Sequence, residues 1–316
     1  MVRADEPFPV GDRDVLLLSP HLDDAWLSAA ALIGATKCEI WTVFGGAPDP
    51  AQQTAWDIAS GFTDSDATMA ARTAEDRAAF SDMESRVRRL PYLEASYAEP
   101  PLRREQSAAL RADLQEWAEQ RPGGVLALPV CAGVHVEPAT WQKARERLRQ
   151  SDAGAPPQSA GTDSPAAASA AAPSSASASP ESRRAAASLV RRAMHADHQR
   201  RRRKAQRRGM AANPDHVLVR DVGLEVAAAV PGVEVLLWED LPYLWHERGA
   251  ARIARLERSY GLDATRIDVE VDVAQKYRRL SNYASQLEVL DPQHKRLTDR
   301  AGLPATETYW MMRRRA

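Results

Sequence analysis

A histidine and two adjacent carboxylates follow the first apolar run of the chain. The run spans Val15 to Ser19 and stops at Pro20, and His21, Asp23 and Asp24 come directly after it. A turn at i, i+3 spacing can aim His21 and Asp24 at one point, with Asp23 beside them. Imidazole and carboxylate groups are ligands of zinc and similar divalent ions. The same residues would also suit a plain helix cap, because Asp favours helix N-termini.

The elements around these residues decide where they would lie. The apolar run is too short for a buried helix and is typical of a central parallel strand, whose ladder Pro20 would end. Helix-forming residues occupy positions 25–35 just beyond. In open α/β sheets, ligands bind at the carboxyl ends of the strands. The pattern therefore predicts that the histidine and its two carboxylates lie at the ligand-binding edge of a sheet.

Strand-like and helix-like segments alternate on both sides of an unusual stretch. Strands are expected at residues 38–44, 90–93, 125–130, 233–238 and 267–273, and helices at 69–86, 102–120 and 276–290. This alternation predicts an α/β fold with a Rossmann-like, doubly wound, mostly parallel sheet. Residues 151–210 are rich in Ala, Ser and Pro and then in Arg, so we expect a disordered insertion there. Residues 1–150 and 211–316 would form the two parts of one catalytic domain.

The segment Ser-Pro-His-Leu-Asp-Asp-Ala-Trp-Leu-Ser resembles the opening Pro-His-x-Asp-Asp motif of the PIG-L/LmbE-like family of zinc-dependent N-deacetylases. The resemblance covers roughly residues 13 to 135 and 213 to 312. Further family-like matches are Arg72-x-x-Glu75-Asp76, Lys276 followed by Tyr283-Ala-Ser-Gln286, and Glu307-Thr-Tyr-Trp310. The resemblance implies an LmbE-like fold and a hydrolase that removes an N-acyl group, most simply an acetyl group.

Two segments compete for the family's second metal motif, His-x-Asp-His. The segment His-Ala-Asp-His198 matches it by letter, whereas Asn213-Pro-Asp-His216 matches it by context, because an apolar-periodic helix and a strand follow. Arginine runs flank His198, and a cationic block makes a poor wall for a metal ion. We therefore favour His216 as the third ligand, with His198 and then His135 as the alternatives.

The resemblance also implies roles for these residues. His21, Asp24 and His216 would bind zinc, and Asp23 would take the proton of the attacking water. Asn213 stands where the family has a histidine that donates to the developing oxyanion. An asparagine amide can still donate that hydrogen bond, but it cannot transfer a proton. The substitution puts turnover in question more than metal binding.

Three further side chains receive expected roles. Asp215 would orient an imidazole of the site through a hydrogen bond. Arg72 would face the substrate, or else belong to an ordinary solvated helix face. Glu94 would hydrogen-bond a sugar hydroxyl. By resemblance, the substrate would be a small N-acetyl amino sugar, such as N-acetylglucosamine, or a conjugate of one.

Composition limits the remaining classes. The 316 residues are 44% hydrophobic with a net charge of −1, as in an ordinary soluble protein. Cys38 and Cys131 lie in apolar runs without metal-type spacing, so we expect buried free thiols. The sequence begins without an apolar signal region, and no run approaches the length of a membrane span. These features predict a cytoplasmic location.

A second class of function stays open, namely a lapsed deacetylase fold that binds a sugar or a nucleic acid. The arginine-rich block of residues 191–208 would support contacts with phosphates. However, no aromatic residues are interleaved with those arginines, so bases would find no stacking platform. We therefore do not expect a nucleic-acid partner.

Overall fold

The computed structural model describes residues 2–3, 6–131, 213–243, 249–290 and 296–315. The described residues of the ranges 1–135 and 209–316 form one compact unit. His135, His198 and the expected insertion at 151–210 lie outside the described residues, so the division of the chain into three parts remains a prediction.

A seven-stranded sheet with the order β3-β2-β1-β4-β5-β7-β6 organises the described part of the chain. Its strands are β1 (Val15–Ser19), β2 (Glu39–Thr42), β3 (Val87–Arg89), β4 (Val125–Pro129), β5 (Glu234–Trp238), β6 (Leu262–Glu270) and β7 (Thr306–Arg314). Strands β1 to β5 pair in parallel, whereas β7 runs antiparallel to both β5 and β6. The predicted doubly wound, mostly parallel sheet is confirmed.

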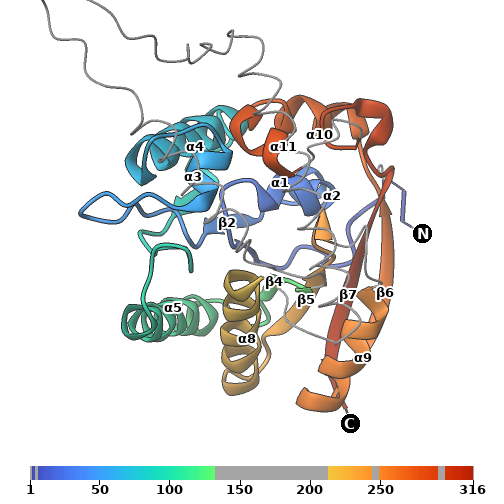
Figure 1. Cartoon of the computed structure of the whole chain (residues 1–316). Coiled ribbons are helices and arrows are strands. Elements are labelled where there is room, and N and C mark those ends of the chain that lie inside the picture. Colours follow the sequence, from blue (N-terminus) through green and yellow to red (C-terminus); the bar gives the residue numbers. More distant parts are fainter. Residues whose placement is uncertain (1, 4–5, 132–212, 244–248, 291–295, 316) are drawn as a thin grey trace, which may run out of the picture. The chain divides into compact units, whose positions relative to one another are not determined.

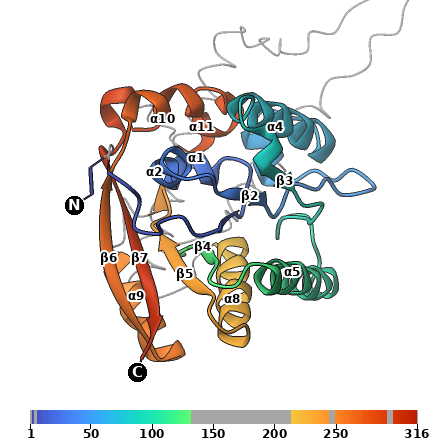
Figure 2. The same cartoon turned by 180° about the vertical axis from the view of Figure 1, so that it is seen from behind.

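Helices cover both faces of the sheet (Figure 1, Figure 2). One face carries α1 (Asp24–Ser28), α2 (Ala30–Ala35), α4 (Ser65–Ala79), α10 (Val273–Leu280) and α11 (Ala284–Leu290); the other carries α5 (Pro100–Gln120), α8 (Pro214–Ala229) and α9 (Gly249–Tyr260). The short helix α3 (Ala55–Ala59) lies in the connection between β2 and α4. Within the described segments, no helix is long and apolar enough to cross a membrane.

The two hydrophobic cores follow from the alternation of side chains along the central strands. In β1, Leu17 belongs to the core under α1 and α2, while Leu16 and Leu18 belong to the core under α5 and α8. All three are fully buried, and burying one such side chain contributes about 1.5–3 kcal/mol. Because both faces of β1 are buried, its sequence reads as a continuous apolar run.

The helix expected over residues 25–35 is interrupted at Ala29, which has φ −133° and ψ 29°. Glu307 of β7 caps the second piece, α2, by accepting hydrogen bonds from the backbone of Ala30 (3.1 Å) and Ala31 (2.9 Å). The Lys276 ammonium and the Tyr309 hydroxyl each donate to the same carboxylate at 2.6 Å. We call Lys276, Glu307 and Tyr309 the C-terminal clamp.

Several expected boundaries are wrong, and long-range pairing explains the clearest case. No strand runs over residues 90–93: Leu90 accepts from Gly45 N at 3.1 Å, and Tyr92 accepts from Gly46 N at 3.1 Å, so this segment meets the loop after β2. A Cβ on Gly46 would lie 2.3 Å from the Pro91 carbonyl oxygen, so the contact requires glycine. The strand in this part of the chain is β3, which lies just before the expected segment and ends at Arg89.

The helix expected at 69–86 starts earlier and ends earlier. Asp64 caps its N-terminus by accepting from Ala67 N at 2.9 Å, and the helix ends at Ala79.

The expected buried free thiols are confirmed, since Cys38 and Cys131 are buried and form no disulfide.

Candidate metal centre

The strand order changes direction at the carboxyl end of β1. The neighbours of β1 are β2 on one side and β4 on the other, so the connections leave in opposite directions at this point. Ligands bind at such switch points in open α/β sheets. The turn after β1 and the N-terminus of α8, which leads into β5, contribute the side chains described below.

Local hydrogen bonds fix both segments. The Ser19 hydroxyl donates to the His21 carbonyl at 2.6 Å and accepts from Ala25 N at 3.0 Å, which closes the turn after β1. Asn213 is the N-cap of α8, where its side-chain oxygen accepts from Asp215 N at 2.9 Å. Pro214 follows at the first helical position, which suits its fixed φ. The two segments therefore present their side chains from well-defined backbone.

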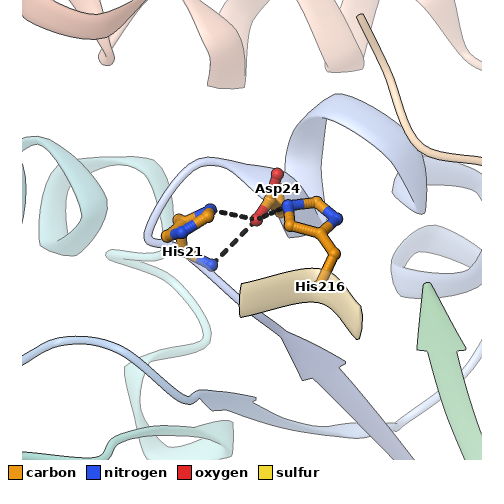
Figure 3. A group of neighbouring side chains, drawn as sticks. All are labelled: His21, Asp24 and His216. Atoms are coloured by element: carbon orange, nitrogen blue, oxygen red, sulfur yellow. Dashed lines mark hydrogen bonds and ion pairs between the residues drawn. The ribbon is translucent and has the colours of Figure 1, made fainter. Parts of the chain in front are cut away.

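His21, Asp24 and His216 converge on one point (Figure 3), and their potential ligand atoms all lie within 4.8 Å of one another. One oxygen of Asp24, Oδ2, lies 3.0 Å from His21 Nδ1 and 3.2 Å from His216 Nε2, and it accepts from His21 N at 2.8 Å. All three residues are buried. The three residues favoured as ligands from the sequence are thus brought together across a gap of nearly two hundred positions.

Each imidazole has a second carboxylate at its other nitrogen. His21 Nε2 lies 3.1 Å from Asp215 Oδ2, and His216 Nδ1 lies 2.7 Å from Asp240 Oδ2. Carboxylates on the far side of a histidine ring are a recurring feature of metal sites, because they fix the orientation of the ring. Asp215 thus lies where the sequence predicted an orienting hydrogen bond.

The donor set fits a divalent cation. His216 Nε2 is buried and within ion-pair distance of Asp24, yet it makes no hydrogen bond with any described group. A buried nitrogen without a hydrogen bond is costly in a folded protein. Two imidazoles and one carboxylate are a set that binds zinc, and the same set occurs in other transition-metal sites. A cation at this point would satisfy the orphaned nitrogen.

The charges of the cluster also favour a bound divalent cation. Burial alone would lower the pKa of His216, but Asp24 and Asp240 raise that pKa to about 9. Burial likewise opposes the charged ring of His21, yet Asp24 and Asp215 raise its pKa well above the usual value. Without a cation, the carboxylates therefore favour a second proton on each ring, which gives the ring a positive charge. A divalent ion carries the same charge as those two protons.

Asp23 lies beside the cluster and interacts with a buried ion pair. Burial and the neighbouring Asp24 raise the pKa of Asp23 to about 6, although Arg72 opposes the shift. Arg72 Nη2 lies 3.9 Å from Asp23 Oδ1, and Arg72 Nη1 donates to Glu94. Arg72 and Glu94 are 3% and 8% exposed, so most of their surface is covered by protein. Their predicted contacts with a substrate remain predictions.

Asn213 makes one further contact, in which its Nδ2 donates to the Tyr243 hydroxyl at 3.2 Å. Burial and the nearby Asp24 raise the pKa of Tyr243, so the phenol keeps its proton. The Tyr243 ring stands edge-on to the His216 ring with centroids 5.3 Å apart. Two neutral hydrogen-bonding groups therefore border the cluster on the α8 side.

Sequence reasoning missed Asp240, Arg103 and Tyr243 as members of this site. Asp240 follows the carboxyl end of β5, so the rule that singled out the turn after β1 would also have found it. Arg103 forms an ion pair with Asp215 Oδ1 at 2.7 Å, and its guanidinium lies over the Phe44 ring. Because Arg103 comes from the first turn of α5, no local signal connects it to the site.

Several solved structures that match this chain in fold are deacetylases. The crystal structure of the zinc-inhibited form of teicoplanin deacetylase Orf2 matches with a TM-score of 0.58 and 18% identity, over 96% of this chain and 98% of that chain. A deacetylase–teicoplanin complex matches with a TM-score of 0.54 and 19% identity, over 96% of this chain and 99% of that one. The A40926 pseudoaglycone deacetylase Dbv21 matches with a TM-score of 0.53 and 21% identity, over 96% of this chain and 99% of that chain.

At these identities the likeness establishes the fold, which is that of the deacetylases just named. No protein-family model matches the sequence, and neither does any curated protein. The PIG-L/LmbE-like resemblance therefore rests on the sequence motifs, and the solved structures add only a shared fold.

Proposed function

We propose that this protein is a metal-dependent hydrolase that removes an N-acyl group, in the simplest case acetyl, from an amino sugar or its conjugate. The observation that carries the proposal is the convergence of His21, Asp24 and His216 at the switch point of the sheet, with Asp23 beside them. Deacetylases among the solved structures of the same fold support it. The proposed metal is zinc.

The proposed ligands are His21, Asp24 and His216. When bound, the cation supplies Lewis acidity to an amide carbonyl and makes a water molecule more acidic. Asp215 and Asp240 hold the two imidazole rings in place, and Arg103 holds Asp215. This division leaves Asp23 free to move protons.

In the proposed reaction, the Asp23 carboxylate accepts the proton of the attacking water as that water adds to the amide carbon. The Asn213 amide donates a hydrogen bond to the oxygen that becomes negative. Protonated Asp23 then returns its proton to the amine as the C–N bond breaks, because Asn213 has no proton to transfer. Arg72 stays beside Asp23 throughout and stabilises its charged form.

Asp23→Asn tests this role directly. The substitution keeps the size of the side chain and removes its basicity, so acetate release from N-acetylglucosamine or an alkyl N-acetylglucosaminide should fall about 10²- to 10⁴-fold. Zinc content should stay at the parental level, because Asp23 is not a proposed ligand. Unchanged acetate release in Asp23→Asn would overturn the role of Asp23, and a parent that binds zinc without releasing acetate would leave the sugar-binding alternative.

A further inference from the structure

The first two turns of α5 carry two polar side chains that are largely covered by protein. Helix α5 packs beside α8 on one face of the sheet (Figure 1, Figure 2). Arg103 and Gln106 are three positions apart in α5, so their side chains leave the same side of the helix. The side chain of Arg103 is 14% exposed and Gln106 is 6% exposed. Polar groups with so little access to water need partners in the protein.

Arg103 contacts the Asp215 carboxylate directly. Its Nη1 forms an ion pair with Asp215 Oδ1 at 2.7 Å and donates to the Leu93 carbonyl at 3.3 Å. The guanidinium lies over the Phe44 ring, 4.8 Å from the ring centroid, where the face of the ring attracts a cation. Contacts with three segments therefore hold the guanidinium, and the ion pair in turn holds one oxygen of Asp215.

Gln106 holds the segment that supplies another donor to Asp215. Its amide oxygen accepts from Leu93 N at 2.7 Å, and its amide nitrogen donates to the Leu93 carbonyl at 3.2 Å. Two residues further on, Ala95 N donates to both oxygens of Asp215, at 3.1 and 3.2 Å. Residues 93–95 belong to no helix or strand, so side-chain contacts must hold their backbone. Gln106 makes such contacts from α5.

The Asp215 carboxylate has three partners among the described residues, and α5 holds two of them. These two are Arg103, directly, and the peptide N–H of Ala95, through the preceding backbone. The third partner is His21, whose Nε2 lies 3.1 Å from Asp215 Oδ2, while Nδ1 on the same ring lies 3.0 Å from Asp24 Oδ2. The orientation of the His21 ring therefore depends on where Asp215 is held.

We propose that Arg103 and Gln106 are positioning residues for the metal centre, acting through the Asp215 carboxylate on the ring of His21. The inference rests on the proposed function, because it assumes that His21 is a metal ligand. Gln106 acts at the greater distance, because its two hydrogen bonds reach the carboxylate only through the backbone of residues 93–95.

Zinc affinities of matched variants test this role. Arg103→Met removes the ion pair and should weaken zinc binding about 10- to 100-fold, the range found for groups that orient metal ligands. Gln106→Met removes both hydrogen bonds to Leu93 and should weaken zinc binding about 3- to 10-fold, because it acts through the backbone. Arg104→Met and Gln115→Met are controls at exposed positions of the same helix and should leave zinc affinity unchanged.

Unchanged zinc affinity in Arg103→Met, or equal losses in the two control variants, would overturn the proposal. Should Arg103→Met not fold, Arg103→Lys is the second variant. It keeps the charge but loses the planar group that reaches Asp215 and Leu93 together, so it should weaken zinc binding about 3- to 10-fold.

A double-mutant cycle tests the route through Asp215. Asp215→Ala alone should weaken zinc binding about 10- to 100-fold. If α5 acts through this carboxylate, adding Arg103→Met or Gln106→Met to Asp215→Ala should weaken binding by less than about twofold more. Additive losses would show that the two residues of α5 act by another route.

A second readout uses the metal-free protein. The proton on His21 Nε2, at the nitrogen that faces Asp215, should give a downfield NMR resonance. Arg103→Met and Gln106→Met should shift or broaden that resonance, because both change where its acceptor is held. The same resonance unchanged in Arg103→Met would contradict the inference.

The other imidazole provides an internal reference for this measurement. His216 Nδ1 faces Asp240, whose described contacts are with that ring and with the backbone of Cys131, and none is with α5. The proton on His216 Nδ1 should therefore keep its chemical shift in the α5 variants, whereas a general loosening of the fold would change both resonances. Neither readout involves acetate release, so the inference and the deacetylase function can fail independently.

Discussion

The metal centre and the C-terminal clamp both bury charged side chains, but they balance charge differently. In the clamp, the Lys276 ammonium, the Tyr309 hydroxyl and two peptide N–H groups surround the Glu307 carboxylate. The cluster is neutral as it stands, so it needs no further partner. Such a cluster fixes architecture, here the start of α2 against β7.

The metal centre has an excess of negative charge. The carboxylates Asp23, Asp24, Asp215 and Asp240 gather around two imidazoles. Arg103 pairs with Asp215 and Arg72 with Glu94, so the remaining carboxylates still outnumber the cations. The raised pKa values of His21 and His216 reflect these nearby carboxylates. The comparison suggests a way to distinguish the two kinds of buried polar cluster: a cluster balanced by its own cations is structural, whereas a cluster that lacks a cation is suited to bind one.

The largest expected effect is the loss of the ion itself. His216→Ala should reduce the zinc content of the purified protein to background, because it removes one of three proposed ligands. His198→Ala, the alternative from the sequence, should keep full zinc content. Elemental analysis of both variants decides between them. Loss of zinc in His198→Ala alone would assign the third ligand to the other segment.

Substitutions in the C-terminal clamp should lower the free energy of unfolding and leave metal binding unchanged. Lys276→Met leaves the buried Glu307 carboxylate without its cation, which should lower the free energy of unfolding by about 3–5 kcal/mol. Adding Glu307→Gln to Lys276→Met removes the stranded charge and should recover a large part of this loss. Urea unfolding measures both changes. Zinc content per folded molecule should not change, and a fall in it would mean that the two clusters are coupled.

A smaller effect is expected at Asp76, a buried carboxylate of α4. Burial raises the pKa of Asp76 to about 6, although Arg89 and the Tyr283 hydroxyl oppose the shift. Because the folded-state pKa is the higher one, the folded protein binds the extra proton. The resulting stability is present below about pH 4 and is lost as the pH rises through 6.

Asp76→Asn removes this dependence. The difference in unfolding free energy between the parent and Asp76→Asn should therefore fall by up to about 3 kcal/mol between pH 4 and pH 7. Asp82→Asn is the control at an exposed carboxylate, whose pKa is lowered by a hydrogen bond from Arg279. A difference that rises with pH at Asp76 would reverse the assigned sign.

The sequence predicted those parts of the fold that local patterns encode. The apolar run of β1 and the Pro-His-x-Asp-Asp turn lie where expected, and the helix expected after Asn213 is present as α8. The segment at residues 90–93 was misjudged because its partners, Gly45 and Gly46, are distant in sequence. The break at Ala29 depends on Glu307 for the same reason. Long-range hydrogen bonds leave no periodic signal.

The same limit applies to the site. His21 and Asp24 are close in sequence, and the turn that joins them can be anticipated from spacing. Asp240 could have been found by its place at the carboxyl end of β5, whereas Arg103 acts only through contacts made after folding, so no local pattern reveals it. Arg103 is an example. It lies in α5, its ion-pair partner Asp215 lies in α8, and the Phe44 ring under its guanidinium follows β2, so these contacts exist only once the three segments have packed together.

The distribution of the proposed ligands along the chain also bears on the order of folding. His21 and Asp24 lie near the start of the chain and His216 follows nearly two hundred residues later, so neither half of the chain holds a complete donor set. Loop closure over so many residues carries an entropy cost that β4–β5 pairing and the packing of α8 must offset. Zinc uptake should therefore come late in folding, after α8 has docked, and a metal bound there would act as a staple between the two halves.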